Sequence, residues 1–436
     1  MDTLHITGGR PLYGQIVIGG AKNAALPLMC AALLTRERVT LDNVPYLADI
    51  TTMAKLLVQH GASLALRDTS PGTLFGGESP GQYSREMSLT CEVIQNITAP
   101  YELVRTMRAS ILVLGPILAR EGRAKVSLPG GCAIGARPVD LHLKAMECLG
   151  AKITLEEGYV LAEAPEGGLV GGAVHFDKVS VGATENVLMA ATLASGTTTI
   201  TNAACEPEIT DLAHMLVSMG ADISGIGTTT LVIRGVSALS GTSYRVIPDR
   251  IETGTFLVAV GIVGGEVELL DARADTLGVV IDTLRHIGVT IEERETSLLV
   301  RRDPATPLMP LDITTAPFPE FPTDMQAQLM TLLTQAEGDS KLCETIFENR
   351  FMHVPELARM GANITIDGHC ATVHGPTKLK GAPVMATDLR ASVSLVIAAL
   401  AATGDTTVGR IYHLDRGYER LEEKLGLCGA NIRRVR

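Results

Sequence analysis

The sequence predicts an α+β protein assembled from six repeated units. One phrase recurs along its 436 residues: a helix-like stretch, a glycine followed by alanine (once by valine), and a short strand-like run. The glycines of this phrase stand at positions 61, 150, 220, 288, 361 and 429. Most intervals are about 70 residues and the first is about 90, and a recurring period indicates repeated structural units. The composition is that of a globular chain, with 46% hydrophobic and 19% charged residues.

Each unit has the same predicted order of elements. A strand-like run such as 124–128 comes first, and an apolar helix such as 24–34 follows. A second strand (197–200 in one unit) and an amphipathic helix (209–219) come next. The glycine suits the C′ position of that helix, where a positive φ costs little. The closing strand shows the alternation of period two, as in residues 151–155.

The number of units bears on the domain organisation. Repeats can stack into an open solenoid, but six large units without evident capping repeats favour a closed assembly. We expect two domains of three units each, with central helices and surrounding sheets, although the spacing alone does not fix this grouping. The first interval is longer because residues 67–101 carry an extra segment rich in Gly, Ser and Pro, and we expect a surface excursion at 67–85.

Charge and cysteine usage exclude several classes of protein. A net charge of −11 argues against nucleic acid as the main partner, but not against a small anion bound by a few arginines. The apolar runs are too short to span a bilayer, and residues 1–10 lack a signal-peptide core. The eight cysteines form no CxxC or zinc spacing, so we expect reduced thiols, no metal and a cytoplasmic location. Three residues of one segment are expected at a strand edge rather than on a metal: His369, Cys370 and His374.

Cys132 lies in the segment Pro-Gly-Gly-Cys-Ala-Ile-Gly-Ala-Arg-Pro-Val-Asp, residues 129–140. Its three glycines and two prolines predict a loop rather than a helix or strand. The ordinary alternative is a buried free cysteine that packs as a small hydrophobe. The glycines and the nearby Arg137 instead favour an exposed thiol whose thiolate is stabilised.

Lys22 lies in a second candidate site, Gly-Gly-Ala-Lys-Asn-Ala, residues 19–24. Backbone N–H groups at the start of a helix bind anions, and Lys22 adds a positive charge there. An ordinary turn with a solvated lysine is equally consistent with this segment, which is not a Walker motif.

Further charged residues occur in other units. Arg108 precedes an apolar stretch and would also suit the surface. Asp324 precedes a helix-like run, where it or Thr323 would also suit an N-cap. The late arginines are Arg350, Arg390 and Arg416, and the aspartates beside the last two would also suit simple surface pairs. Basic residues spread over several units predict a small, multiply anionic ligand between two domains.

Longer motifs indicate a family resemblance, which extends from Leu4 to Arg434. They are GGAKNAALP, TMRAS, LPGGCAIGARPVDLH, DKVSVGAT, EPEI, PDRIETGTF, FPTDMQAQ, FENRFMHVPEL, MATDLRAS and DRGYERLEEKL. With them the chain resembles the UDP-N-acetylglucosamine 1-carboxyvinyltransferases, a family of enolpyruvyl transferases. The resemblance implies an inside-out α/β barrel fold with two domains of three βαβαββ-type units and a site between them. One domain would cover residues 22–247 and the other residues 1–21 with 248–436.

The resemblance also implies a reaction. The enolpyruvyl group of phosphoenolpyruvate would pass to the 3′-hydroxyl of UDP-N-acetylglucosamine with release of phosphate, the first committed step of peptidoglycan precursor synthesis. Addition followed by elimination would need no metal and no organic cofactor. The implied partners are these two small molecules, without nucleic acid or membrane.

Roles for individual residues follow from the same resemblance. Cys132 would be the general acid and Asp324 the base that accepts the sugar hydroxyl proton. Lys22, Arg137 and Arg416 would hold the phosphate. Arg350 and Arg390 would surround the carboxylate of phosphoenolpyruvate, with Asp388 beside them. The residues implied for the UDP-sugar are Asn23, Arg108, Arg137, Pro138, Val139, Asp140, Leu141, Lys178, Val179, Ser180, Val181, Asp324 and Ile346. Glu206 and Arg250 match further residues between the domains.

Two alternatives remain. A transferase acting on shikimate 3-phosphate shares the fold, but its family lacks the PGGC loop and the segment 177–182. A catalytically silent, repeat-built regulatory protein would explain the units but not the joint presence of Lys22, Cys132, Asp324 and Arg416.

Overall fold

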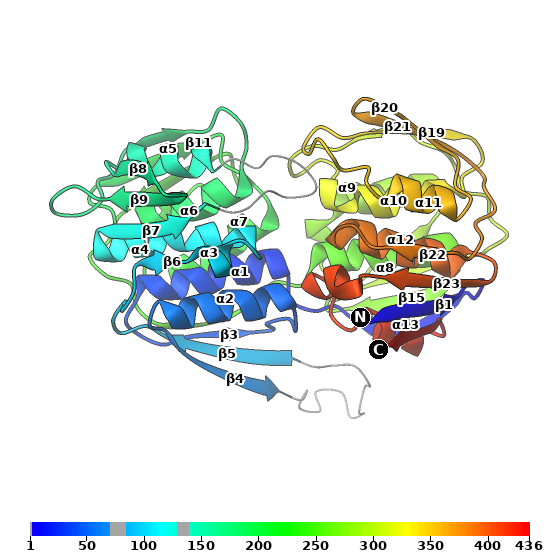
Figure 1. Ribbon diagram of the computed structural model, residues 1–436, viewed down its shortest axis with the longest axis horizontal. Helices are drawn as coiled ribbons and strands as arrows, with labels where there is room; N and C mark the ends of the chain where they lie inside the picture. The colour runs from blue at the N-terminus through cyan, green and yellow to red at the C-terminus, as the bar shows by residue number, and fades with distance from the viewer. Residues whose placement is uncertain (1, 70–83, 129–138) are drawn as a thin grey trace.

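The predicted strand patterns form six four-stranded sheets, three in each of two lobes that lie side by side (Figure 1). The computed structural model describes residues 2–69, 84–128 and 139–436. Each sheet has one parallel pair at an edge, followed by two antiparallel pairs. The predicted α+β fold of six repeated units is confirmed.

The first lobe contains three of these sheets. In spatial order they are β14 (Thr242–Arg245), β3 (Val39–Asp42), β5 (Ser84–Thr90) and β4 (Ser63–Thr69); β6 (Thr98–Ala99), β7 (Arg123–Ser127), β9 (Tyr159–Glu163) and β8 (Lys152–Glu156); and β10 (Ala173–His175), β11 (Thr197–Thr201), β13 (Thr230–Arg234) and β12 (Asp222–Ser224).

The second lobe repeats the arrangement. Its sheets are β2 (Leu12–Val17), β15 (Gly265–Leu270), β17 (Ser297–Arg302) and β16 (Thr290–Glu293); β18 (Ile313–Thr314), β19 (Asp339–Cys343), β21 (Cys370–His374) and β20 (Ile364–Asp367); and β22 (Pro383–Met385), β23 (Asp405–Gly409), β1 (Thr3–Thr7) and β24 (Asn431–Val435).

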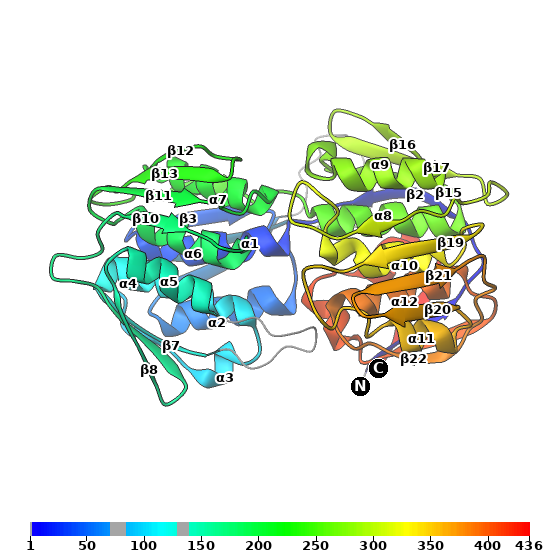
Figure 2. The same ribbon diagram turned by 90° about the horizontal axis from the view of Figure 1, so that it is seen from above.

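The longer helices are of two kinds, which differ in burial. The apolar ones are buried almost all round, and α8, α10 and α12 pack side by side in the second lobe (Figure 2). They are α1 (Lys22–Ala31), α4 (Leu114–Glu121), α6 (Val181–Ala191), α8 (Arg250–Val263), α10 (Gln326–Leu333) and α12 (Leu389–Ala401). The amphipathic helices are α2 (Ala48–Gln59), α5 (Asp140–Cys148), α7 (Pro207–Ser218), α9 (Gly278–Ile287), α11 (Val354–Arg359) and α13 (Leu421–Leu427). Short helices complete the set: α3 (Tyr101–Val104), η1 (Ala32–Leu34), η2 (Arg108–Val113), η3 (Ala274–Thr276), η4 (Thr323–Met325) and η5 (Ile411–Arg416).

The recurring glycine ends a helix in every unit. All six glycines have a positive φ, between 86° and 114°. The residue after each glycine donates its N–H to a carbonyl in the last helical turn, as Ala62 does to Leu57 at 3.0 Å. This is the Schellman arrangement, which explains why glycine recurs at these positions.

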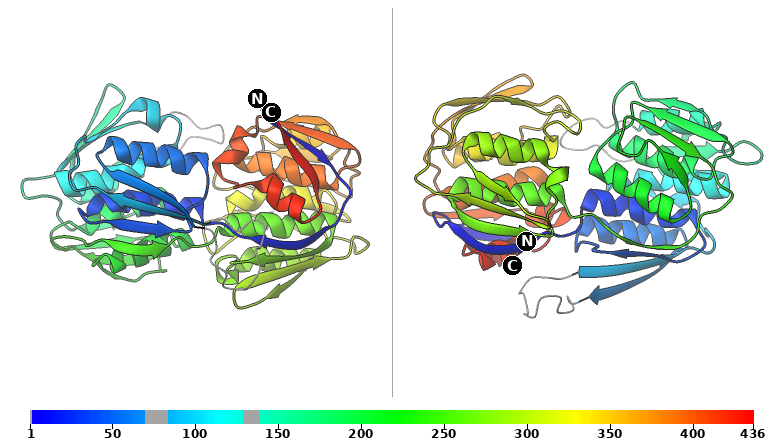
Figure 3. Two further views of the ribbon diagram at one scale, coloured as in Figure 1. Left: turned by 90° about the horizontal axis from the view of Figure 1, so that it is seen from below. Right: turned by 180° about the vertical axis from the view of Figure 1, so that it is seen from behind.

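The chain passes between the two lobes twice, and the two passages lie together. The buried apolar residues form two separate clusters: one runs from Ala21 to Val246, and the other joins residues 4–18 to 251–428. At the passage, Ala21 N donates to Ile247 O at 2.7 Å and Asp249 N donates to Gly19 O at 2.8 Å. The N-terminal strands thus complete sheets of the second lobe, where β1 lies between β23 and β24 (Figure 3).

The structure pairs Cys343 and Cys370 in a disulfide, so the expectation that all thiols are reduced is wrong for these two. Strands β4 and β5 flank the extra segment of the first unit, and most of its predicted excursion, 70–83, lies outside the described residues. None of the helices in the described ranges is long and apolar enough to cross a membrane.

Candidate functional site

Asp324 lies in η4 and is held by two buried arginines, Arg350 of the same unit and Arg390 of the next. Arg350 Nη2 donates to Asp324 Oδ1 at 2.7 Å, and Arg390 Nη2 donates to Asp324 Oδ2 at 2.9 Å. The arginine side chains are 4% and 5% exposed, whereas that of Asp324 is 26% exposed. Both carboxylate oxygens therefore have a charged partner, in the geometry by which arginines bind a carboxylate ligand.

The two arginines determine the charge state of Asp324. Burial alone would raise the pKa of this carboxyl, but Arg390 and Arg350 outweigh that effect and hold the pKa well below its ordinary value. Asp324 is therefore an ionised carboxylate while both arginines contact it.

Asp49 holds a second pair of cations, one from each lobe. Its Oδ2 lies 3.2 Å from Lys22 Nζ, and its Oδ1 lies 2.9 Å from Arg416 Nε. Lys22 begins α1, Asp49 lies in the first turn of α2, and Arg416 ends η5 in the second lobe. Burial lowers the pKa of Lys22, while the charge of Asp49 acts to raise it.

The two groups of charges belong to one site. The charge of Lys22 contributes to the low pKa of Asp324, and Arg390 and Arg416 both lower the pKa of Lys22. A buried hydroxyl helps to orient Arg390. Tyr418 Oη accepts from Arg390 Nη1 and from Gln328 Nε2, each at 3.2 Å. Tyr418 also lies 2.9 Å from Thr255 Oγ1.

Arg250 and Glu208 form a second ion pair between the lobes. Arg250 begins α8, and its Nε and Nη2 lie 3.0 and 3.3 Å from the two carboxylate oxygens of Glu208 on α7. Glu206 accepts a long bond from Phe318 N at 3.4 Å, and its other oxygen is buried without a hydrogen-bond partner. Burial raises the pKa of Glu206, and the neighbouring Glu208 adds to this.

Five of the residues implied for the UDP-sugar lie at helix starts in the first lobe. Arg108 begins η2, Asp140 begins α5 with Val139 as its N-cap, and Val181 begins α6. Ser180 caps α6, accepting from Ala183 N at 3.3 Å. Helix starts present free N–H groups and a positive dipole end, which suit anionic groups. Four further members in the first lobe are the partly buried Asn23, Leu141 and Val179 and the exposed Lys178.

His142 links α5 to the middle of α6. Its Nδ1 lies 3.1 Å from Asn186 Nδ2, and Asn186 Oδ1 accepts from Gly115 N of α4 at 2.7 Å. Burial, with a further contribution from Arg108, lowers the pKa of His142 to about 4. The imidazole is therefore neutral at physiological pH and keeps α5 against α6.

Several expectations for single residues can be compared with their positions. Asp324 and Thr323 do not act as N-caps: Thr323 Oγ1 donates to Glu344 at 2.8 Å. Asp388 caps α12 through the N–H groups of Arg390 and Ala391, while the Arg390 guanidinium binds Asp324. Asp415 pairs with Arg434 rather than with Arg416. The late arginines are therefore not simple surface pairs with neighbouring aspartates.

Ile346 is linked to the site through Glu344. Its N–H donates to the Glu344 carboxylate at 2.8 Å, and the same carboxylate accepts from Thr323, the residue before Asp324. Cys132, Arg137 and Pro138 lie outside the described residues. Within the ranges that the structure describes, no three His, Cys, Asp or Glu side chains gather as a metal site requires.

Sequence reasoning missed Asp49, Glu208 and Tyr418. Asp49 and Glu208 are 5% and 3% exposed and occupy the first turns of amphipathic helices. Their neighbours Ile50 and Ile209 are buried, so each acid stands where the pattern calls for an apolar residue. That mismatch is the signal that would have identified them, because a buried carboxylate needs a partner.

Comparison with known proteins gives a consistent picture. A family model described as EPSP synthase (3-phosphoshikimate 1-carboxyvinyltransferase) matches residues 6–425. The chain is 60% identical over 436 residues to the UDP-N-acetylglucosamine 1-carboxyvinyltransferase of Rhodospirillum centenum, covering 100% of this chain and 99% of the relative. It is 58% identical to the protein of that name from Agrobacterium fabrum, with both chains fully covered.

Solved structures with the same fold are also found. The enolpyruvyl transferase NikO from Streptomyces tendae has a TM-score of 0.86 at 26% identity, covering 100% of this chain and 99% of that one. An EPSP synthase from Acinetobacter baumannii has a TM-score of 0.74 at 19% identity, with both chains fully covered.

Proposed function

Since the chain belongs to the UDP-N-acetylglucosamine 1-carboxyvinyltransferases, within the enolpyruvyl transferases, we propose that it transfers the enolpyruvyl group of phosphoenolpyruvate to the 3′-hydroxyl of UDP-N-acetylglucosamine. The sugar oxygen bonds to the central carbon of phosphoenolpyruvate, and the terminal vinyl carbon gains a proton. The tetrahedral intermediate then loses a methyl proton and phosphate, which restores the double bond.

One observation carries this proposal: two internal carboxylates each hold two cations at one site. Asp324 holds Arg350 and Arg390, and Asp49 holds Lys22 and Arg416. Phosphoenolpyruvate brings one carboxylate and one phosphate. Its carboxylate would replace Asp324 on the two arginines, and its phosphate would share the two cations of Asp49.

This exchange gives Asp324 its role as the base. While both arginines contact it, the low pKa of Asp324 makes it a weak proton acceptor. When the substrate carboxylate takes the arginines, burial becomes the dominant influence and raises the pKa of Asp324. The base would thus be activated only when phosphoenolpyruvate is in place.

Cys132 would supply the proton to the vinyl carbon, and Arg137 would join Lys22 and Arg416 on the phosphate. The UDP-sugar would lie along the helix starts at Arg108, Asp140 and Val181, with Ile346 on the side of the second lobe. We further propose that residues 22–247 form one domain and residues 1–21 with 248–436 the other, in a cytoplasmic enzyme.

The choice of acceptor rests on the degree of similarity. The curated relatives that share 58–60% of their residues with this chain are named for UDP-N-acetylglucosamine. The EPSP synthase structure shares 19% and supports the fold alone. UDP-N-acetylglucosamine is therefore favoured over shikimate 3-phosphate.

Phosphate release by the purified full-length chain tests the proposal. We expect release only when phosphoenolpyruvate and UDP-N-acetylglucosamine are both present, and its loss in Asp324→Asn. Asp222→Asn, at the exposed Asp222–Arg234 pair, is the matched control and should retain full rates. Release with shikimate 3-phosphate instead, or no release with either acceptor, would overturn it.

A further inference from the structure

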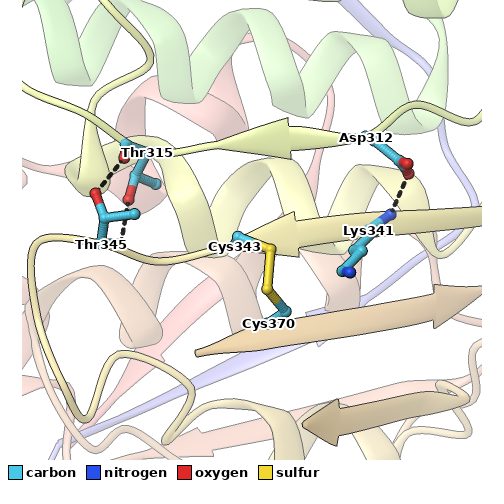
Figure 4. The surroundings of a disulfide bond; sticks show 6 residues. All are labelled: Asp312, Thr315, Lys341, Cys343, Thr345 and Cys370. Atoms are coloured by element: carbon cyan, nitrogen blue, oxygen red, sulfur yellow. Dashed lines mark hydrogen bonds between the residues drawn. A yellow bond between two sulfur atoms is a disulfide. The ribbon is translucent and has the colours of Figure 1, made fainter. Parts of the chain in front are cut away.

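Cys343 and Cys370 form a cross-strand pair on the outer face of a sheet in the second lobe (Figure 4). They lie directly opposite each other, at the end of β19 and the start of β21, with their Cα atoms 4.0 Å apart. Ser340, Leu342, Ala371 and Val373 of these strands are buried, whereas both cysteines are partly exposed. The pair is therefore open to solvent, and the strands hold the two sulfur atoms within bonding reach.

The residue after Cys343 connects this pair to the candidate site. Glu344 is 2% exposed, and its carboxylate accepts four hydrogen bonds. It accepts from Thr323 Oγ1 at 2.8 Å, Thr315 Oγ1 at 2.9 Å, Ile346 N at 2.8 Å and Phe347 N at 3.2 Å. Thr323 precedes Asp324, so a single buried carboxylate sets the position of both the base and the Ile346 segment.

The strand of the other cysteine is joined to the backbone of the same residue. Glu344 N donates to the carbonyl of His369, the residue before Cys370, at 2.8 Å. The disulfide lies at the same end of the β19–β21 ladder as this hydrogen bond. It therefore restrains the backbone of Glu344, which follows β19, and that of His369, which precedes β21. Terminal rungs of a ladder open readily, so loss of the covalent bond would loosen this end first.

We propose that Cys343 and Cys370 are a thiol–disulfide exchange site that takes small disulfides and thiols of the glutathione class, and that its state modulates binding of the sugar nucleotide. This coupling rests on the proposed function; the exchange itself does not. Disulfides in cytoplasmic proteins are mostly redox-active rather than structural, which fits a reversible pair.

The chemistry is balanced. A thiolate of the reduced pair attacks a sulfur of the small disulfide, forms a mixed disulfide and releases one small thiolate. The second cysteine thiolate then attacks the protein sulfur, closes the Cys343–Cys370 bond and releases the second small thiolate. The pair has lost two electrons and two protons, and the small disulfide has become two thiols. The reverse sequence reduces the pair.

The first experiment measures thiol–disulfide exchange at Cys343 and Cys370 and does not depend on enzyme activity. The full-length protein is equilibrated with glutathione at several ratios of disulfide to thiol, alkylated, and mapped by mass spectrometry. We expect Cys343 and Cys370 to pass together from alkylated to linked as the ratio rises, while the exposed Cys148 forms no link to either. A pair that stays linked, or stays alkylated, at every ratio would refute the exchange.

The second experiment reads the coupling to the site. We expect the Ile346 and Phe347 amides to exchange hydrogen about fivefold faster in the reduced protein, and KM for UDP-N-acetylglucosamine to rise about threefold with kcat little changed. Cys343→Ser/Cys370→Ser should match the reduced form at every ratio, and Cys148→Ser should behave as the wild type. Cys132 is exposed to the same glutathione disulfide in all these proteins. Any effect of oxidation at Cys132 is therefore common to them, and the difference in KM and amide exchange between the wild type and the double variant reports on the Cys343–Cys370 pair.

The two readouts separate failure of this proposal from failure of the proposed function. Equal amide exchange in the oxidised and reduced proteins would refute the coupling even if the enzyme is active. If no acceptor supports phosphate release, the proposed function fails, but thiol mapping and amide exchange still decide whether the pair exchanges and moves the Ile346 segment.

Discussion

Arg416 and Asp49 stand 367 positions apart in the sequence, yet they form an ion pair between the two lobes, with Nε and Oδ1 2.9 Å apart. The same carboxylate contacts Lys22 at 3.2 Å. One buried acid therefore orients two of the cations assigned to the phosphate.

Asp49→Asn should reduce kcat/KM for phosphoenolpyruvate by about 10- to 100-fold, because misplaced charged groups lose this much of a transition-state interaction. Phosphate release at varied phosphoenolpyruvate concentrations measures the loss. The control is Asp415→Asn, since Asp415 is adjacent to Arg416 but pairs with Arg434. Equal effects of the two substitutions would contradict the role given to Asp49.

Tyr418→Phe should lower the free energy of unfolding by about 1–2 kcal/mol, because Arg390 and Gln328 lose a buried acceptor. Activity should also fall, since Arg390 is less firmly oriented toward the substrate carboxylate. Urea unfolding and steady-state rates check both effects. Tyr412→Phe removes an equivalent hydroxyl at a side chain that is 49% exposed, and should change neither quantity.

Arg250→Gln should lower the free energy of unfolding by about 3 kcal/mol, because Glu208 is then left buried without its cation. Arg234→Gln is the matched control, since its pair with Asp222 is exposed and such pairs contribute little. Urea denaturation midpoints compare the variants. A small effect for Arg250→Gln would contradict the role given to this buried ion pair.

His142 should make the protein less stable as the pH falls. Burial lowers its pKa from 6.5 to about 4, so between these values the unfolded chain binds more protons than the folded one. The stabilisation is fully present above pH 6.5 and decreases toward pH 4, by at most about 3 kcal/mol. His142→Gln should flatten this part of the curve of stability against pH, whereas His286→Gln, at an exposed site, should leave it unchanged. Unfolding in urea at a series of pH values provides the comparison.

Local patterns in the sequence predicted most of the fold. The glycines at the helix ends and the alternation of residues 151–155 depend only on nearby backbone geometry, and the predicted helix 24–34 coincides with α1 and η1. The place of the N-terminal strands in the second lobe had no such local signal. Strand β2 leads directly into α1 of the first lobe, yet it pairs with β15 of the second lobe. This is possible because the chain enters the first lobe at residues 19–21 and leaves it beside them, at residues 247–249.

The site was predictable where a residue stands in an unusual local context, and not where its partner is remote. Lys22 at a helix start and Asp324 after a proline-rich segment were candidates with ordinary alternatives, and the family resemblance supplied their roles. Asp49 was missed because its two partners lie at positions 22 and 416, which no local pattern connects. The position of Glu344 beside Cys343 gave no sign that its carboxylate binds Thr323.

Because the N-terminal strands β1 and β2 belong to the second lobe, the order in which a nascent chain can fold is also constrained. The first core is built entirely from residues 21–246, so it can form while the ribosome is still adding the remaining residues. Strand β1 is translated about 400 residues before its two neighbours, β23 and β24. It must therefore wait for its partners while the residues between them are made, and until then both of its edges are open to other chains.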